Sequence, residues 1–371
     1  MSNIETILLA SYSSESTFRI GSSFAASLYQ KPLTIFLRGD LGAGKTTFVQ
    51  GLGLGLPTSL PFKELRGAGR LHITSPTYAL ENRYGETLLH LDLFRIDPKE
   101  AHTLVESSED FPGIRVIEWS DRLFSSSEQS ATKRVERLLA SALLDAASLE
   151  ENIVISFSEL SPTTREIGIT FADLPLPDRA QIESWRSEVH LPEHVARHCD
   201  AVGAFAKQLG EELLRRGVVV RIEALRCAGE LHDLLRFVDF RKKLPPYLRG
   251  VYPEILEKDQ AVWNELGKTY PSPHEEACAR FLEDHGYRAL ATIIRPHGLS
   301  TIDHPEELRT IEQKLLFYSD KRIRFDQIVS LDERFEDFMK RYGEGQESEQ
   351  ANRWREKTRQ LEEELFGDDV P

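Results

Sequence analysis

Eight consecutive residues carry the clearest chemical pattern in the chain. They read Gly39-Asp40-Leu41-Gly42-Ala43-Gly44-Lys45-Thr46, which has the form G-x-x-x-x-G-K-[ST]. Glycines let backbone N–H groups turn inward around phosphate oxygens, and a helix start adds the positive end of its dipole. Lys45 is expected to reach the β- and γ-phosphates of a nucleotide, and Thr46 is expected to hold Mg²⁺. The spacing therefore predicts a phosphate-binding loop.

Two acids near the ends of predicted strands could complete a magnesium site. Asp92 lies near the end of one apolar stretch, and Glu118 lies near the end of another. A carboxylate on a strand beside a phosphate loop can complete the shell of the metal or orient a water molecule. We therefore interpret Asp92 and Glu118 as candidate catalytic or metal-binding residues.

A second set of potential ligands lies in the other half of the chain, beyond residue 189, where most of the 11 histidines occur. Neutral imidazoles with carboxylates bind a divalent transition metal and leave positions for water and phosphate. Such a metal lowers the pKa of its water and polarises a phosphoryl oxygen. The set predicts a metal site for phosphate-ester chemistry and comprises His198, His232, Asp233, His274, His297 and Asp320.

The elements expected around the phosphate loop define an α/β P-loop domain with a mixed central sheet and flanking helices. A buried strand at 33–37 precedes the loop, and a helix opens at Thr47. Residues 57–70 are expected to form a flexible insertion because they are rich in Pro and Gly. The other expected elements are a short strand after residue 5, a helix at 14–30, strands at 71–78, 84–96 and 114–119, helices at 98–108 and 130–148, and a hairpin at 153–157 and 166–171.

The second half is expected to be helical. Pro192 favours a helix that begins near Glu193, and a second helix is expected over 224–235. Later helical segments would carry His274, His297 and Asp320. The tail at 331–371 is charged and helix-prone, and we expect a solvated helix or a frayed end.

Length and composition bound the organisation of the chain. With 371 residues it exceeds a comfortable single core, so two domains are expected. We predict a nucleotide-binding domain at 1–175, a linker at 176–189, a metal-binding domain at 190–330 and the tail at 331–371. The net charge of −14 argues against a surface that binds nucleic acid throughout, and leaves a local basic patch or a basic partner open.

The chain shows no pattern of membrane insertion or secretion. It has no run of 18 apolar residues and no basic segment ahead of the short apolar stretch at its N-terminus. Its three cysteines, Cys199, Cys227 and Cys278, lack the spacing of a metal or disulfide framework. These features predict a cytoplasmic protein.

The first half resembles the TsaE (YjeE) family, the ATPase component of the bacterial machinery that makes N6-threonylcarbamoyladenosine in tRNA. The resemblance covers roughly residues 5–175. It rests on four motifs in order, namely residues 39–46, Thr74-Ser75-Pro76-Thr77-Tyr78, His90-Leu91-Asp92-Leu93-Phe94-Arg95 and Ile117-Glu118-Trp119-Ser120. It implies a small P-loop ATPase that binds ATP and Mg²⁺ and acts with TsaB- and TsaD-like proteins, with tRNA an indirect partner.

The TsaE resemblance also implies roles for single residues. Thr46 and Glu118 would be the Mg²⁺ ligands, and Asp92 would be the acid needed for turnover. Residues 75–78 would form a switch-like loop near the γ-phosphate, and Trp119 would lie near the nucleotide. Catalysis would thus involve Lys45, Asp92 and Glu118. The expected nucleotide-binding residues are Gly39, Asp40, Leu41, Gly42, Ala43, Gly44, Lys45, Thr46, Thr47 and Trp119.

Residues 188–330 resemble the HD-domain phosphohydrolase superfamily, which implies an all-helical domain with one or two metals. By motif position, a first metal would be held by His198, His232, Asp233 and Asp320, and a second by His274 and His297. Asp233 would also be catalytic, and Lys321 would offset charge on the phosphate. The metal could be Mn, Fe, Zn, Co or Ni. The resemblance names no substrate beyond a nucleotide or a related phosphoester.

Two interpretations follow from these resemblances. In the first, the chain is a bifunctional enzyme with an ATPase for tRNA modification and a metal-dependent phosphohydrolase. In the second, the N-terminal half is a nucleotide-gated assembly module for the threonylcarbamoyl transferase, and the helical half is a metal-stabilised scaffold without catalysis.

Overall fold

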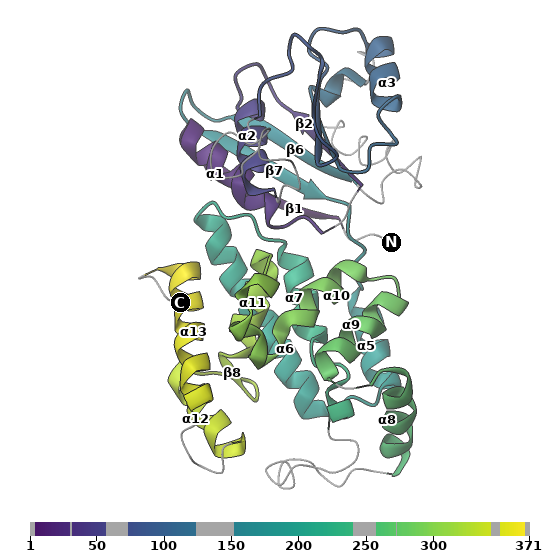
Figure 1. Ribbon diagram of the computed structural model, residues 1–371, viewed down its shortest axis with the longest axis vertical. Coiled ribbons are helices and arrows are strands. Elements are labelled where there is room, and N and C mark those ends of the chain that lie inside the picture. The colour runs from purple at the N-terminus through teal and green to yellow at the C-terminus, as the bar shows by residue number, and fades with distance from the viewer. Residues whose placement is uncertain are drawn as a thin grey trace. The chain divides into compact units, whose positions relative to one another are not determined.

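The computed structural model describes residues 4–29, 32–56, 73–123, 152–239, 257–271, 273–342 and 349–367. The chain divides into two compact units (Figure 1). Unit 1 comprises Met1–Pro175 with Leu214–Val219, and unit 2 comprises Leu176–Leu213 with Val220–Pro371. The expected helix at 130–148 and the expected insertion at 57–70 lie outside the described residues.

Unit 1 is built on a seven-stranded mixed sheet with strand order β1-β7-β6-β2-β5-β4-β3. The four strands β6, β2, β5 and β4 are parallel neighbours, and β1, β7 and β3 pair antiparallel. This is the mixed α/β sheet expected from the sequence. The strands are β1 (Glu5–Ser11), β2 (Leu33–Arg38), β3 (Glu81–Tyr84), β4 (Leu88–Asp92), β5 (Ile114–Glu118), β6 (Asn152–Glu159) and β7 (Arg165–Phe171).

Helices α1 (Ser14–Ala25) and α2 (Lys45–Gly55) pack against each other (Figure 1). Their buried side chains join one core cluster with the strands, whereas α3 (Pro98–Glu106) contributes Ala101 to a second cluster. Side chains alternate between the two faces of a strand, so Leu88 belongs to the first cluster and Leu89 to the second. The short 3-10 helix η2 (Ser120–Leu123) follows β5.

Three expectations for unit 1 were wrong in detail. The helix expected at 14–30 ends at Ala25. The strand expected at 84–96 is shorter and belongs to a hairpin of β3 and β4, because Gly85 adopts a positive φ of 57° in a turn between them. The described part of the strand expected at 71–78 is irregular, since Pro76 lacks an N–H and the Ser75 and Thr77 hydroxyls bond to each other instead.

Unit 2 is predominantly helical, with one two-stranded hairpin of β8 (Ile323–Arg324) and β9 (Gln327–Ile328). Residues 179–188, expected to be part of a linker, form helix α5, and its Trp185 is buried edge-on against Phe281. The other helices are α6 (Glu193–Arg215), α7 (Ile222–Leu231), η4 (Arg236–Asp239), α8 (Glu257–Thr269), α9 (His274–Asp284), α10 (Arg288–Ile294), η6 (Arg295–His297), η7 (Leu299–Asp303), η8 (Pro305–Glu307), α11 (Ile311–Asp320), α12 (Leu331–Tyr342) and α13 (Glu349–Phe366).

The helix expected over 224–235 is shorter, because α7 ends at Leu231 and a turn follows. This turn places His232 and Asp233 directly after the helix. Helices α6 and α7 approach closely at Gly203 and Gly229, where a Cβ on Gly229 would lie 2.5 Å from the Cα of Gly203. Only glycine permits this approach of two backbones.

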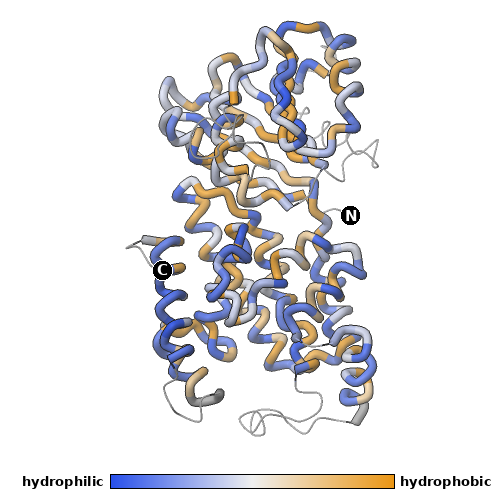
Figure 2. Tube along the Cα trace, viewed as in Figure 1, coloured by the Kyte–Doolittle hydropathy of each residue, from blue (hydrophilic) through white to orange (hydrophobic). Residues whose placement is uncertain are grey.

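The tail was expected to be solvated or frayed, and that prediction was wrong. Helix α13 is hydrophilic over most of its length (Figure 2), yet Leu361, Leu365 and Phe366 are buried. Its polar residues also bond to unit 2, since the Trp354 indole N–H and the Lys357 ammonium both donate to Asp303 at 2.7 Å. Glu362 accepts from Tyr318 of α11. The tail is therefore a packed part of the helical unit.

Candidate functional site

The phosphate-loop motif connects β2 to α2 in a tight turn. Gly39, Gly42 and Gly44 all have positive φ, at 138°, 80° and 103°, and α2 begins at Lys45 directly after them. Residues with a side chain rarely adopt these conformations, which explains glycine at each position. The loop therefore has the backbone that a phosphate cradle at a helix N-terminus requires.

Lys45 is buried and folds back over this loop. Its ammonium donates to the carbonyl oxygens of Gly39 at 2.7 Å and Asp40 at 2.9 Å, and it lies 3.8 Å from the centre of the Trp119 ring. Burial lowers the pKa of Lys45, and the negative charge of Glu118 opposes that shift. The structure thus brings Lys45 and Trp119 together at the loop. Trp119 itself has a positive φ of 59°, an unusual conformation for a bulky residue.

The two strand-end acids lie opposite each other because β4 and β5 pair in parallel with Asp92 in register with Glu118. The Thr46 hydroxyl donates to Oε1 of Glu118 at 2.9 Å. This direct contact joins the start of α2 to β5 and fits residues that share a magnesium ion, since Mg²⁺ prefers hydroxyl and carboxylate oxygens. Thr47, the next residue of α2, is half-buried.

Asp92 is tied to the residues expected to form a switch-like loop. Its Oδ2 accepts from the Thr77 hydroxyl at 2.6 Å, and its Oδ1 accepts from the backbone N–H of Phe94 at 2.9 Å. Tyr78, the next residue after Thr77, is 85% exposed and lies under the Arg95 guanidinium. The loop at 75–78 is therefore linked to the acid expected to support turnover.

His90 begins one of the four motifs of the TsaE resemblance, but no role was assigned to it from the sequence. It is fully buried in the middle of β4, and its Nε2 lies 2.9 Å from Oε1 of Glu118. Besides that motif, the signal was a titratable residue within a strand whose other positions up to Leu91 are leucine. Its partner lies 28 residues away, so no local pattern could identify the contact.

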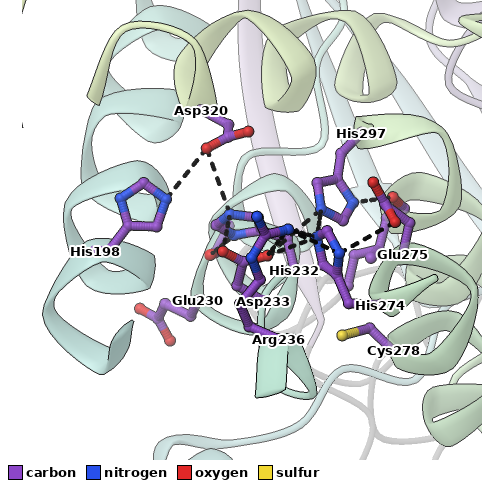
Figure 3. A network of polar contacts seen from close by, with 12 residues as sticks. His198, Glu230, His232, Asp233, Arg236, His274, Glu275, Cys278, His297 and Asp320 are labelled. Atoms are coloured by element: carbon purple, nitrogen blue, oxygen red, sulfur yellow. Dashed lines mark hydrogen bonds and ion pairs between the residues drawn. The ribbon is translucent and has the colours of Figure 1, made fainter. Parts of the chain in front are cut away.

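In unit 2 the structure brings together all six residues of the expected metal set (Figure 3). They come from separate elements. His198 lies on α6, His232 and Asp233 follow α7, His274 begins α9, His297 ends η6 and Asp320 ends α11. The close approach of α6 and α7 at their glycines allows the rings of His198 and His232 to lie 5.4 Å apart.

Two groups of ligand atoms share Asp233. One group is His198, His232 and Asp233, and the other is Asp233, His274 and His297, each with its ligand atoms within 4.8 Å of one another. Asp320 lies beside the first group, with Oδ1 3.2 Å from Nε2 of His198. In the second group, Nε2 of His274 lies 2.9 Å from Oδ1 of Asp233. The two groups therefore have one carboxylate in common.

Three of the histidines direct Nε2 into the cluster because Nδ1 is held by a backbone carbonyl. Nδ1 of His232 bonds to the oxygen of Gly229 at 2.8 Å, and Nδ1 of His297 bonds to that of Ile294 at 2.7 Å. Nδ1 of His198 bonds to the oxygen of Phe325 at 2.8 Å. A carbonyl can only accept, so Nδ1 carries the proton and Nε2 can present a lone pair. Metal-binding histidines are commonly oriented in this way.

Nε2 of His232 supplies a test of whether a metal fits. It is buried and makes no hydrogen bond to any described residue. The nearest carboxylate oxygens, on Asp320 and Asp233, lie 3.7 and 3.8 Å away. Zinc-type metals bind nitrogen and oxygen at about 2.0–2.2 Å, so two ligand atoms of one tetrahedral metal lie about 3.3–3.6 Å apart, which is close to these separations. The donor set therefore fits a divalent metal.

The charges of the cluster shift its pKa values in opposite directions. Burial alone lowers the pKa of His232, but Asp233, Cys199 and Asp320 together outweigh burial and raise that pKa well above its usual value. Burial raises the pKa of Asp320, but Lys321 and His198 outweigh it and hold that pKa well below its usual value. The pKa of His297 is lowered by burial and by the neighbouring histidines.

Lys321 lies deeper than expected for a residue that contacts substrate. It is buried, its ammonium donates to the carbonyl of His297 at 2.9 Å, and it pairs with Asp320. This position suits a residue that holds a metal ligand in place, rather than one that offsets the charge of a phosphate.

Three further charged residues of this cluster were not identified from sequence. Nδ1 of His274 lies 2.6 Å from Oδ2 of Asp239 and 3.2 Å from Oε2 of Glu275. The Arg236 guanidinium lies 2.6 Å from Nε2 of the same histidine. The only sequence signal for Arg236 and Asp239 was that they closely follow the His232-Asp233 pair along the chain.

The mixed sheet, the phosphate loop and the strand-end acids define unit 1 as a P-loop α/β unit. The family model of the threonylcarbamoyl adenosine biosynthesis protein TsaE matches residues 11–142. The TsaE protein of Treponema pallidum is 34% identical over 119 residues, which cover 31% of this chain and 79% of the relative. That of Aquifex aeolicus is 34% identical over 114 residues, which cover 30% and 74%. The chain belongs to the TsaE family.

The match is confined to part of both chains. The TsaE protein of Nostoc sp. is 44% identical over 117 residues, which are 29% of this chain and 65% of the relative. The chain thus spans slightly less than two thirds of that relative's length. The solved structure titled "Crystal structure of Bacillus subtilus YdiB" is 22% identical to this chain. The match covers 46% of this chain and 89% of that structure, with a TM-score of 0.28.

The helical unit lies entirely beyond the residues that the family model matches. Among the described residues, no helix is both long enough and apolar enough to span a membrane.

Proposed function

We propose that unit 1 binds and hydrolyses ATP with Mg²⁺ in the biosynthesis of N6-threonylcarbamoyladenosine in tRNA. The observation that carries this proposal is the Thr46–Glu118 hydrogen bond at the end of a phosphate loop, with Asp92 in register beside Glu118. Family membership supports the pathway, since the relatives are named for it. TsaB- and TsaD-like proteins are the proposed partners, with tRNA as their substrate.

Each proposed site residue of unit 1 has its own role in this proposal. Lys45 exchanges its bonds to the loop carbonyls for phosphate oxygens, which neutralises their charge. Thr46 and Glu118 supply oxygen ligands to Mg²⁺. Asp92, held by Thr77, orients the water or senses the terminal phosphate through the loop at 75–78.

Two substitutions test this proposal against the assembly-module alternative. Lys45→Ala is expected to abolish nucleotide binding and assembly with the partner proteins. Asp92→Ala is expected to spare binding and assembly and to stop phosphate release. Slow hydrolysis by the wild-type chain together with ATP-dependent assembly would favour the nucleotide-gated module. Loss of assembly in Asp92→Ala would contradict that gate.

We also propose that unit 2 is a metal-dependent phosphohydrolase of the HD type. The observation that carries this proposal is the pair of ligand groups sharing Asp233, with the unpaired Nε2 of His232 directed into the first group. A bound divalent metal would lower the pKa of a water molecule and polarise a phosphoryl oxygen. The histidines hold the ligand atoms in place through their Nδ1 bonds, and Asp233 and Asp320 supply the negative charge.

The test uses the full-length Lys45→Ala chain, so that phosphate release by unit 1 does not mask that of unit 2. The chain is loaded with Mn²⁺ and incubated with a panel of nucleotides and phosphoesters, and metal content is measured in parallel. His232→Ala is expected to lose metal and activity together. His304→Ala is the matched control, because His304 is exposed and outside the cluster. Bound metal without turnover of any compound would favour the scaffold alternative.

A further inference from the structure

His90 has a defined position relative to the proposed magnesium ligands. All five residues of β4 are buried, and His90 lies on the same face as Asp92 because the two are separated by one residue. In the parallel pairing with β5, His90 is opposite Val116, so Glu118 is its diagonal neighbour on that face. Leu88 and Val116 on this face join the core cluster that contains Phe48 of α2. His90 is thus placed beside Glu118 by the strand register.

Two donors converge on one oxygen of Glu118. The Thr46 hydroxyl and the His90 ring nitrogen Nε2 both lie 2.9 Å from Oε1. An ionised carboxylate only accepts hydrogen bonds, so Nε2 of His90 must carry a proton. Oε2 of Glu118 receives no hydrogen bond from the described residues. One oxygen of the carboxylate is therefore anchored, and the other is available as a ligand.

Packing alone does not explain a histidine at this position. Nδ1 of His90 is buried and has no hydrogen-bond partner among the described residues. An unpaired buried polar atom destabilises the fold, whereas a leucine, as at Leu89 and Leu91, would leave no such atom. The other ring nitrogen, Nε2, contacts Glu118, which is a proposed magnesium ligand. A role in orienting Glu118 explains why this buried position holds a histidine and not a leucine.

We infer that His90 is a positioning residue of the magnesium site, which anchors Oε1 of Glu118 so that Oε2 is directed to the metal or to its water. The inference rests on the nucleotide and magnesium site proposed for unit 1. When Thr46 turns an oxygen lone pair toward Mg²⁺, its hydrogen bond to Glu118 can change, and the His90 bond keeps the carboxylate in place. His90 itself contacts neither metal nor nucleotide.

The test compares two substitutions in the full-length chain with a matched control. His90→Leu removes the donor and keeps an apolar side chain, and His90→Gln retains an N–H donor of similar reach. His102→Leu is the control, because His102 lies on α3 and bonds to the carbonyl of Leu123 outside the site. Binding of a fluorescent ATP analogue is measured in EDTA and then as a function of Mg²⁺ concentration.

His90→Leu is expected to raise the Mg²⁺ concentration that gives half of the maximal change in analogue binding. The expected increase is about 10–100-fold, the usual effect of losing a residue that orients a metal ligand. Binding in EDTA should stay within about twofold of wild type, because His90 contacts no phosphate-loop residue except Thr46 through Glu118. His90→Gln should bring this Mg²⁺ concentration most of the way back to the wild-type value, and His102→Leu should match wild type.

Several results would overturn the inference. They are wild-type Mg²⁺ dependence in His90→Leu, an equal loss in EDTA, or a His90→Gln variant as defective as His90→Leu. If His90→Leu does not fold, ¹H–¹⁵N NMR of the metal-free wild type tests the inference instead, because it shows which ring nitrogen of His90 carries a proton. A proton on Nε2 supports the inference, and a neutral ring protonated on Nδ1 overturns it. Absence of Mg²⁺-dependent binding in the wild type would instead refute the function proposed for unit 1, and the inference with it.

Discussion

The metal site proposed for unit 2 leads to a quantitative prediction about pH. In the metal-free chain the pKa of His232 is raised well above its usual value, because Asp233, Cys199 and Asp320 together outweigh burial. The pKa of His274 is also raised, because Asp233 and Asp239 outweigh burial and Arg236. Both rings therefore hold their second proton to a higher pH than a free imidazole does, and a ring nitrogen must be free of its proton to bind a metal. Metal affinity should therefore increase as pH rises.

The size of the effect follows from counting protons. Asp233 and Asp320 have lowered pKa values and are already ionised, and the pKa of His297 is lowered, so these groups release none. The two rings with raised pKa values, His232 and His274, each release one proton on binding. Each changes the binding free energy by about 1.36 kcal/mol per pH unit, so affinity should rise about 100-fold per unit below both raised pKa values. His232→Asn should reduce the slope to about tenfold per unit.

This slope is measured with Mn²⁺ or Zn²⁺ by competition against a chromophoric chelator between pH 6 and pH 8. Calorimetry in buffers of different ionisation enthalpy counts the protons that are released on metal binding. His304→Asn is the matched control and should keep the wild-type slope. A pH-independent affinity, or one that falls as pH rises, would refute the assignment of these histidines as ligands.

The same pKa shifts predict the stability of the metal-free chain. A histidine with a raised folded-state pKa stabilises the fold below its unfolded pKa of about 6.5, and that contribution is lost as pH rises through the folded value. The melting temperature of unit 2 without metal should therefore fall as pH rises above neutrality. Excess metal should oppose that trend, because binding strengthens over the same range. Parallel trends with and without metal would contradict this linkage.

Three further predictions concern single contacts. Thr46→Val removes the hydroxyl that bonds Glu118 and should weaken Mg²⁺ binding about 10–100-fold, with nucleotide binding in EDTA retained; an unchanged Mg²⁺ titration would contradict it. Gly229→Ala places a Cβ 2.5 Å from Gly203, and should destabilise unit 2 by about 1–3 kcal/mol and lower its metal content, measured by denaturant unfolding and elemental analysis. Leu361→Ala removes a buried side chain of α13 and should cost about 2–5 kcal/mol, whereas a solvated tail would lose nothing.

Local sequence predicted most of the strand and helix positions of unit 1. The turn at Gly85 and the loop around Pro76 were exceptions. In both, a turn conformation or side-chain hydrogen bonds replaced the strand that the apolar pattern favoured. Docking of α13 could not be predicted either. Its few apolar positions bury only because Asp303, Tyr318 and α11 lie where the helix passes.

The sequence by itself determined the phosphate loop, the strand-end acids and the residue types of a metal cluster. Each of these depends on residues that are close in the chain or on the chemistry of a side chain. Tertiary structure alone decided which of them meet. His90 reaches Glu118 through strand register, and His198 reaches Asp320 across 122 positions. The close approach of Gly203 and Gly229 allows two ligand-bearing helices to meet. Such contacts depend on the packing of whole elements, which spacing along the chain does not encode.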